Sequence, residues 1–162
     1  MAASIITSNV GTYNGPDVVV SGIWTPLEDD LVIAFLVNNS TFSLSPVAGW
    51  SDPLGGYQLD PGDFSMEGAA RVHVLTAAEE TAGTTSWTLA SLFGGGTEVG
   101  SYLLVVARAG DPAAPVDAWG TWMTADNTTT TRYLAGLAGA DLSDDSLILR
   151  MIGSDSPTSR TF

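Results

Sequence analysis

The amino-acid sequence predicts an all-β protein, an antiparallel sandwich or barrel of about nine or ten strands with little helix. Apolar residues recur mostly with a period of two, and no segment has the 3.6-residue apolar pattern of a long helix. Charged residues make up only 14% of the chain, so the polar surface must come largely from Thr, Ser, Asn and Gly, which suit strands and turns. With 162 residues the chain has the length of a single domain, residues 1–162.

The first part of the chain contains three expected strands. Residues 4–10 form the first of them. Residues 17–23 follow the turn-forming segment Asn14-Gly15-Pro16 and are rich in valine. Residues 30–37 are a continuous apolar run after an initial Asp, and the run ends at two asparagines. Its length is that of a strand, and its unbroken apolar character indicates a central strand that is covered on both faces.

The middle of the chain alternates irregular segments with strands. Residues 51–68 hold several Pro and Gly residues, so we expect a long irregular connection there. Residues 69–76 and 84–90 alternate in polarity and are expected strands, the second of them half exposed. A loop at Gly94-Gly95-Gly96 precedes a further buried strand at residues 102–107.

The last third of the chain supplies three more expected strands. The segment Asp111-Pro112-Ala113-Ala114-Pro115 can form neither a helix nor a central strand and is expected to be a short linker. Residues 116–123, 128–137 and 146–152 follow it and have strand-like patterns.

The charge of the chain restricts the partners that it can bind. Eighteen acidic residues face five basic ones, all arginine, and the net charge is −13. Nucleic acids and anionic membranes need cationic surfaces, so neither is an expected partner. The chain has no cysteine, no readable signal peptide and no apolar run of membrane-spanning length.

The sequence contains no recognisable set of catalytic residues. His73 is the only histidine, and no Gly-x-Ser-x-Gly segment or cysteine accompanies it, so a structural histidine is expected. Carboxylates occur in pairs that a glycosidase could use, but all of them lie at expected turns or strand ends, where acidic residues commonly cap backbone amides. These pairs are Asp29 with Asp30, Asp60 with Asp63, Glu79 with Glu80, and Asp144 with Asp145.

Calcium is the metal that the loops could best accept. Residues 60–63 and 141–145 offer carboxylate oxygens, but neither segment matches a known calcium-binding loop. The sequence therefore predicts a protein that is not an enzyme and assigns no catalytic, cofactor-binding or metal-binding residue and no cofactor. The five tryptophans are expected mainly in the core, with a sugar platform or an interface anchor as the alternative. They are Trp24, Trp50, Trp87, Trp119 and Trp122.

Several segments, taken in order, resemble a β-sandwich domain of phage and bacterial surface proteins. Residues 30–35 followed by Pro46-Val47-Ala48-Gly49-Trp50 are similar to its "gDLLvaf … pPaGWt" pattern. Later strands of that domain are similar to residues 70–74 (Ala-Arg-Val-His-Val), 86–89 (Ser-Trp-Thr-Leu), 102–110 (Tyr-Leu-Leu-Val-Val-Ala-Arg-Ala-Gly) and 145–150 (Asp-Ser-Leu-Ile-Leu-Arg). The resemblance runs from about residue 17 to residue 152.

The resemblance implies a fold and a role. Such domains occur in minor structural proteins of tailed phages, both head decoration and minor tail proteins, notably of phages that infect actinobacteria. The absence of lysine and the abundance of Ala, Gly and Thr fit a high-GC genome of that kind. The resemblance implies a jelly-roll-like sandwich on the exterior of the virion, with no catalytic residues to transfer. Phage major capsid or tail proteins are then the expected partners, and a homo-oligomer, with a trimer favoured, is the expected state.

The sequence is also compatible with other interpretations. Related domains continue beyond the late segment, so the residues up to Phe162 either pair with a neighbouring subunit or end a short version of the domain. A carbohydrate-binding or host-recognition module would share the fold and would stack exposed Trp or Tyr on a glycan. An enzyme on the same sandwich would need two converging carboxylates. A bacterial adhesin or surface-layer module is the remaining alternative.

Overall fold

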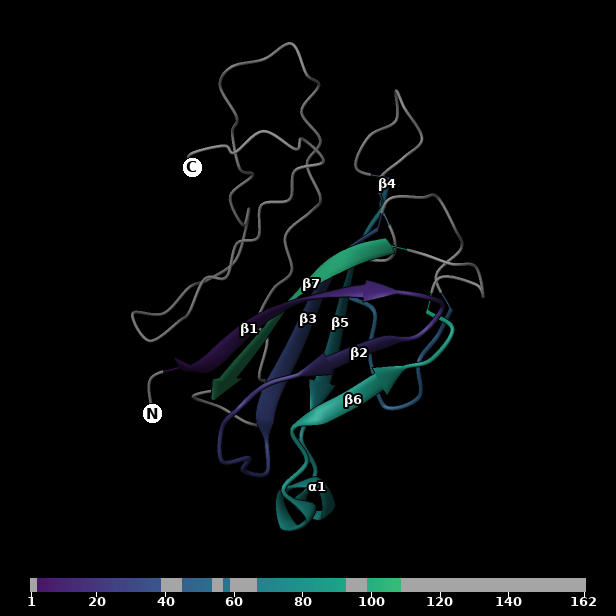
Figure 1. The fold of residues 1–162 in the computed structure, drawn as a ribbon. Coiled ribbons are helices and arrows are strands. Elements are labelled where there is room, and N and C mark those ends of the chain that lie inside the picture. The colour runs from purple at the N-terminus through teal and green to yellow at the C-terminus, as the bar shows by residue number, and fades with distance from the viewer. Residues whose placement is uncertain (1–2, 39–44, 54–56, 59–66, 93–98, 109–162) are drawn as a thin grey trace, which may run out of the picture.

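The computed structural model describes residues 3–38, 45–53, 57–58, 67–92 and 99–108. These residues form antiparallel strands and one short helix, which confirms the all-β prediction (Figure 1). The elements are β1 (Ser4–Asn14), β2 (Val18–Ser21), β3 (Asp30–Asn38), β4 (Tyr57–Gln58), β5 (Glu67–Val74), α1 (Ala77–Ala82), β6 (Ser86–Leu89) and β7 (Val99–Arg108).

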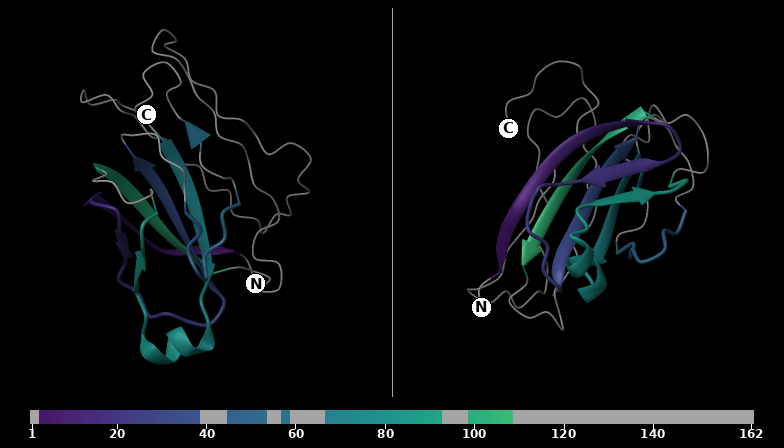
Figure 2. Two further views of the ribbon diagram at one scale, coloured as in Figure 1. Left: turned by 90° about the vertical axis from the view of Figure 1, so that its right-hand side faces the viewer. Right: turned by 60° about the horizontal axis from the view of Figure 1, so that its bottom comes forward.

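The strands belong to two sheets. Five strands form the larger sheet in the order β1-β7-β3-β5-β4, and β2 pairs with β6 in a smaller sheet. Figure 2 shows β2 and β6 as a second layer beside the larger sheet, with α1 at one end of both. Except at β4, the chain passes from one sheet to the other at each connection between consecutive strands. Apart from β4 and β5, which are consecutive, neighbours in the larger sheet are therefore far apart in sequence.

β3 is the central strand that the apolar run predicts. It pairs with β7 on one side and with β5 on the other, and every residue from Asp30 to Leu36 is buried. Because successive side chains point to opposite faces, a strand that is buried throughout has cover on both faces. The prediction of a doubly covered central strand is confirmed.

The two sheets pack against each other through one apolar cluster. We call the face of the larger sheet that meets β2 and β6 the first face. Val32, Ala34 and Leu36 of β3 lie on it, in register with residues of β5 and β7 that share that face. The smaller sheet contributes Val18, Val20 and Leu89, all fully buried. Partly buried residues packed against this cluster are Trp24, Val47, Trp50 and Trp87.

Two reciprocal pairs of tyrosine and glycine join β1 to β7. Tyr13 is opposite Gly100 and Gly11 is opposite Tyr102, so each aromatic side chain lies over the glycine of the facing strand. The Tyr13 hydroxyl donates a hydrogen bond to the carbonyl of Val37, at 3.0 Å. The absence of a Cβ at both glycines is what lets the rings lie flat on the sheet.

Replacement of Gly100 by alanine should destabilise the protein by about 2–3 kcal/mol. A Cβ at this position would clash with the Tyr13 side chain and with the carbonyl oxygen of Val37, which is backbone and cannot rotate away. Urea unfolding measures the effect, and Thr12→Ala on the neighbouring strand β1, at an exposed position beside Tyr13, is the control. A Gly100→Ala protein as stable as the wild type would contradict this packing.

The helix α1 was not expected from the apolar pattern. It has only six residues and none of them is buried, so a periodic apolar stripe is absent. Its start is instead marked by a capping box, in which Thr76 and Glu79 each bond the backbone of the other. Gly83 ends the helix in the left-handed conformation, with φ of 66°. The prediction places Thr76 in the strand at residues 69–76. In the structure Thr76 instead caps the start of the helix.

Other element boundaries differ in detail from the predictions. β1 continues to Asn14, four residues past the predicted end, and β7 begins at Val99, three residues before the predicted start. Their long antiparallel pairing supports both extensions. The expected irregular connection contains the short strand β4. The predicted strands at 116–123, 128–137 and 146–152, the linker at 111–115 and the loop at 94–96 lie outside the described residues. No helix in the described part of the chain is long and apolar enough to cross a membrane.

Candidate functional site

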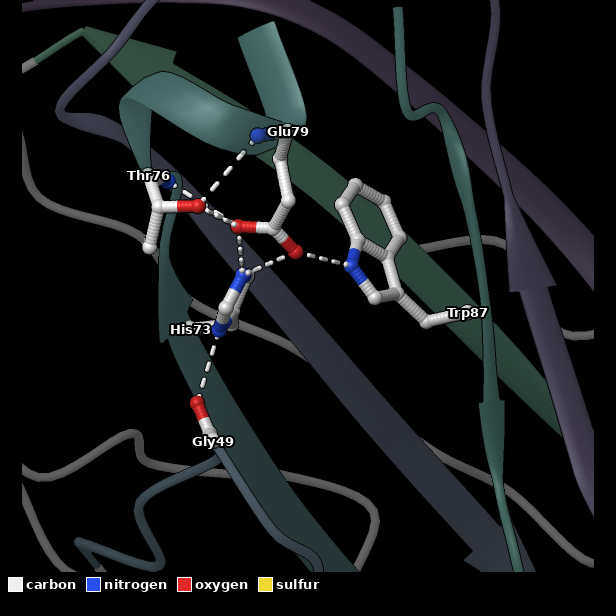
Figure 3. A network of polar contacts seen from close by, with 5 residues as sticks. All are labelled: Gly49, His73, Thr76, Glu79 and Trp87. Carbon is white, nitrogen blue, oxygen red and sulfur yellow. Dashed lines mark hydrogen bonds and ion pairs between the residues drawn. The ribbon is translucent and has the colours of Figure 1, made fainter. Parts of the chain in front are cut away.

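The largest polar network in the described ranges lies where β5, α1 and β6 meet (Figure 3). Its centre is the carboxylate of Glu79, which the capping box holds at the first turn of α1. His73 reaches it from β5 and Trp87 reaches it from β6. His73 projects from the first face, because it lies opposite an inward-facing residue of β3. Trp87 projects toward the first face, because it lies opposite an inward-facing residue of β2.

The Glu79 carboxylate accepts hydrogen bonds from four donors. Trp87 Nε1 donates to Oε1 at 3.0 Å, and the Thr76 backbone amide and hydroxyl donate to Oε2 at 2.9 and 2.8 Å. His73 Nε2 lies 2.9 Å from both oxygens. Burial by itself raises the pKa of Glu79, but these donors outweigh it and lower the pKa from 4.5 to about 2. Glu79 is therefore a fixed anion and not a proton donor near neutral pH.

His73 is buried, with 8% of its surface exposed, and both of its ring nitrogens have partners. Nδ1 lies 2.7 Å from the carbonyl oxygen of Gly49, and Nε2 lies against the Glu79 carboxylate. Both partners are acceptors only, so both bonds form together when the ring carries hydrogen on both nitrogens and pairs with Glu79 as a cation. His73 thus has the satisfied, structural environment that the sequence predicts.

A cluster of three tryptophans packs against His73 and Glu79. Trp50 stacks on the His73 ring with centroids 5.3 Å apart, and Trp87 meets the edge of Trp50 at 6.0 Å. Trp24 stacks on Trp87 at 5.9 Å. All three are half-buried and pack against the apolar cluster between the sheets, as expected of core residues. Trp119 and Trp122 lie outside the described residues.

The arrangement of His73 and Glu79 resembles a base with its orienting acid, but its bonds are already committed. A general base needs one nitrogen free for the nucleophile and the other for the acid. Here the first nitrogen is bonded to the backbone at Gly49 and the second to Glu79. The pair can therefore fix α1 and β6 on the larger sheet, which is the function that its geometry supports.

The predicted carboxylate pairs do not converge where the structure describes them. Asp29 is exposed, whereas its neighbour Asp30 is fully buried and ion-paired with Arg108. Glu79 faces the His73 network, whereas Glu80 accepts a hydrogen bond from the backbone of Glu28. Within the described residues, no group of three or more His, Asp or Glu side chains could hold a metal ion. Asp60, Asp63, Asp144, Asp145 and the calcium candidates at 60–63 and 141–145 lie outside these residues.

A second candidate site is the open margin of the larger sheet along β1. This eleven-residue strand is an edge strand, and no described strand pairs with its outer side. It contains no charged residue and no proline, and three of its apolar side chains are exposed: Ile5 at 50%, Ile6 at 36% and Val10 at 73%. We call these three residues the β1 margin. The sequence alone does not identify the β1 margin, because a strand pattern does not show which strand lies at an edge.

Comparison of the chain with protein-family models, with curated proteins and with solved structures finds no match.

Proposed function

We propose that this chain is a non-enzymatic structural protein that acts through protein–protein contacts made by the β1 margin. The observation that carries the proposal is the exposed, uncharged edge strand. Natural sheets protect their edges with charged side chains, proline or short strands, because an open edge pairs readily with another chain. β1 has a register shift beside Ile6 but none of the other protections, and it is the longest strand in the described part of the chain.

The charge of the molecule favours this strand as the contact surface. A chain of net charge −13 repels its own copies and other acidic proteins over most of its surface. β1 has no charged residue over its eleven positions, so contact along it avoids that repulsion locally. An edge strand supplies backbone hydrogen bonds, and exposed apolar side chains add buried area.

We further propose the particular role that the sequence resemblance suggests. The chain is then a jelly-roll-like β-sandwich on the exterior of a tailed-phage virion, as a head decoration or minor capsid protein, or as a tail accessory protein. Its partners are the major capsid or tail proteins and further copies of itself, with a trimer as the favoured oligomer. The face-to-face packing of the two sheets and the repeated passage of the chain between them support the sandwich.

A charge on the β1 margin should dissociate the oligomer. We expect the wild type to have the mass of a trimer by light scattering, and Val10→Lys to have the mass of a monomer at the same concentration. Burial of an unpaired ammonium in the contact should raise the dissociation constant at least about 100-fold. Val19→Lys is the matched control, because Val19 is an exposed valine, at 52%, on β2 of the smaller sheet.

The outcomes separate the proposal from its alternatives. A wild type that is monomeric at every concentration, or two variants with the same mass, would contradict assembly through the β1 margin. A glycan partner is the alternative function, and the described tryptophans give it little support. Trp24, Trp50 and Trp87 pack against one another, against His73 and against the core, whereas a sugar platform needs exposed ring faces.

A further inference from the structure

The face of the larger sheet that points away from β2 and β6 is apolar across four strands. We call it the second face. In register, Ile33 of β3 lies between Val105 of β7 and Val72 of β5, and Phe35 lies between Leu103 and Ala70 in the next row. Directly opposite residues of antiparallel strands share a face, so these side chains form one continuous surface. Their buried members, with Leu31, make a second apolar cluster that is separate from the one between the sheets.

The centre of the second face is buried, but its margins are exposed. Ile33 has 4% of its surface exposed and Val105 has 5%. Val10 and Ile5, which share this face through their pairing with Leu103 and Ala107, are 73% and 50% exposed. A side chain on an uncovered sheet face resembles these margins and not the centre. A further segment or molecule therefore covers the centre of the second face and leaves the side chains of β1 exposed.

None of the described elements provides that cover. β2 and β6 contribute their buried residues to the first face, and Val47 and Trp50 of the segment 45–53 pack there too. α1 has no buried residue and lies at the end of the sheets, as Figure 2 shows. Among the described residues, only Leu103 of β7 is a partly buried apolar residue packed against the second cluster.

We propose that residues 116–152 of this same chain cover the second face. Arg108 is the last residue of β7, and the segment begins only eight residues later in the chain, so the connection is long enough for the segment to reach the second face. It contains the three strand-like patterns at 116–123, 128–137 and 146–152, and the proline-rich linker at 111–115 can reverse the chain after β7. A tethered segment also has an effective concentration on the order of millimolar, which a separate molecule lacks.

The larger sheet then makes two kinds of contact, one within the chain and one with another molecule. The chain's own segment buries the central rows, from Leu31 to Phe35 on β3. The β1 margin stays uncovered by the chain itself and remains available to another molecule. The inference does not depend on the proposed function, since it rests on the burial of the second face alone.

Trypsin tests the proposal on the intact native protein, because the chain has no lysine and only five arginines. Arg132 and Arg150 lie inside two of the three strand-like patterns, and Arg71 is buried in β5 with 1% exposure. We expect cleavage after Arg132 and Arg150 to be at least about 100-fold slower in the native chain than in urea-denatured chain. Rapid cleavage at these two sites while Arg71 stays protected would overturn the proposal, because the described part would then be folded without its cover. Protection that is lost on dilution would also overturn it and would identify a second copy as the cover.

A matched pair of substitutions tests which face the segment contacts. Val105 and Val106 are neighbours on β7, both buried, on the second and first faces respectively. Val105→Thr places an unpaired hydroxyl under the cover, so cleavage after Arg132 and Arg150 should become roughly tenfold faster while Arg71 stays protected. Val106→Thr weakens the packing between the sheets and should not accelerate these two sites selectively. Equal selective acceleration in both variants, or none in Val105→Thr, would contradict the assignment.

Discussion

Replacement of Arg108 by alanine should destabilise the protein by about 3–5 kcal/mol, the cost of leaving a buried charge without its partner. Asp30, at the start of β3, is fully buried. Arg108, at the end of β7, donates to it through Nε at 2.8 Å and through Nη2 at 3.1 Å. The hydrogen bond and the charge of Asp30 raise the pKa of Arg108 above its ordinary value, against partial burial, which lowers it. The pair joins the two neighbouring strands at the end of the sheet.

Replacement of the other partner, Asp30→Asn, should lower the free energy of unfolding clearly less, by about 1–2 kcal/mol. The asparagine carbonyl can still accept the hydrogen bond that the Leu27 amide now gives to Asp30 Oδ2, at 3.0 Å. The unpaired arginine remains about one-third exposed, at 34%, so water can solvate it. Urea unfolding of both variants at neutral pH gives the comparison. If Asp30→Asn proves more damaging than Arg108→Ala, burial of the carboxylate is not what makes the pair important.

The sequence predicts the strands of this fold better than it predicts their arrangement. The apolar run of β3 indicates a doubly covered central strand, because burial on both faces removes polar residues from the whole strand. The order β1-β7-β3-β5-β4 could not be predicted in the same way, since it depends on pairing between segments far apart in the chain. The same limit applies to the β1 margin, because Ile5 and Val10 become an interaction surface only if β1 lies at an edge.

One part of the polar network at Glu79, the short helix that carries it, has a local signal in the sequence. Glu79 and Glu80 were expected at a turn, and the capping box of Thr76 with Glu79, followed by Gly83, is a recognisable pattern for a short helix. That pattern fixes the position of the Glu79 carboxylate. It does not predict that His73 and Trp87 meet there, because their meeting requires α1 to carry the chain from the larger sheet to the smaller one.

Replacement of Glu79 by glutamine should destabilise the protein by about 2 kcal/mol at neutral pH, and the difference should vanish in acid. Glu79 is 22% exposed, and its shift from a pKa of 4.5 to about 2 is equivalent to at most about 3 kcal/mol before screening by solvent. A glutamine NH₂ group would also face donors, because all the partners of the carboxylate donate hydrogen bonds to it. The loss of these bonds would loosen α1 and Trp87 from the larger sheet.

The pH at which this stability disappears follows from the sign of the shift. A carboxylate whose pKa is lower in the folded state contributes its full stability above the unfolded value of 4.5 and loses it as the pH falls toward 2. The wild type and Glu79→Gln should therefore converge in unfolding free energy between about pH 4.5 and pH 2. Glu80→Gln is the matched control, since Glu80 is the neighbouring residue on α1 and its oxygen accepts only an exposed hydrogen bond from Glu28. We expect a change below about 0.5 kcal/mol for that variant. A constant gap between the wild type and Glu79→Gln down to pH 2 would mean that packing around Trp87, and not the charge of Glu79, holds the two sheets together at this end.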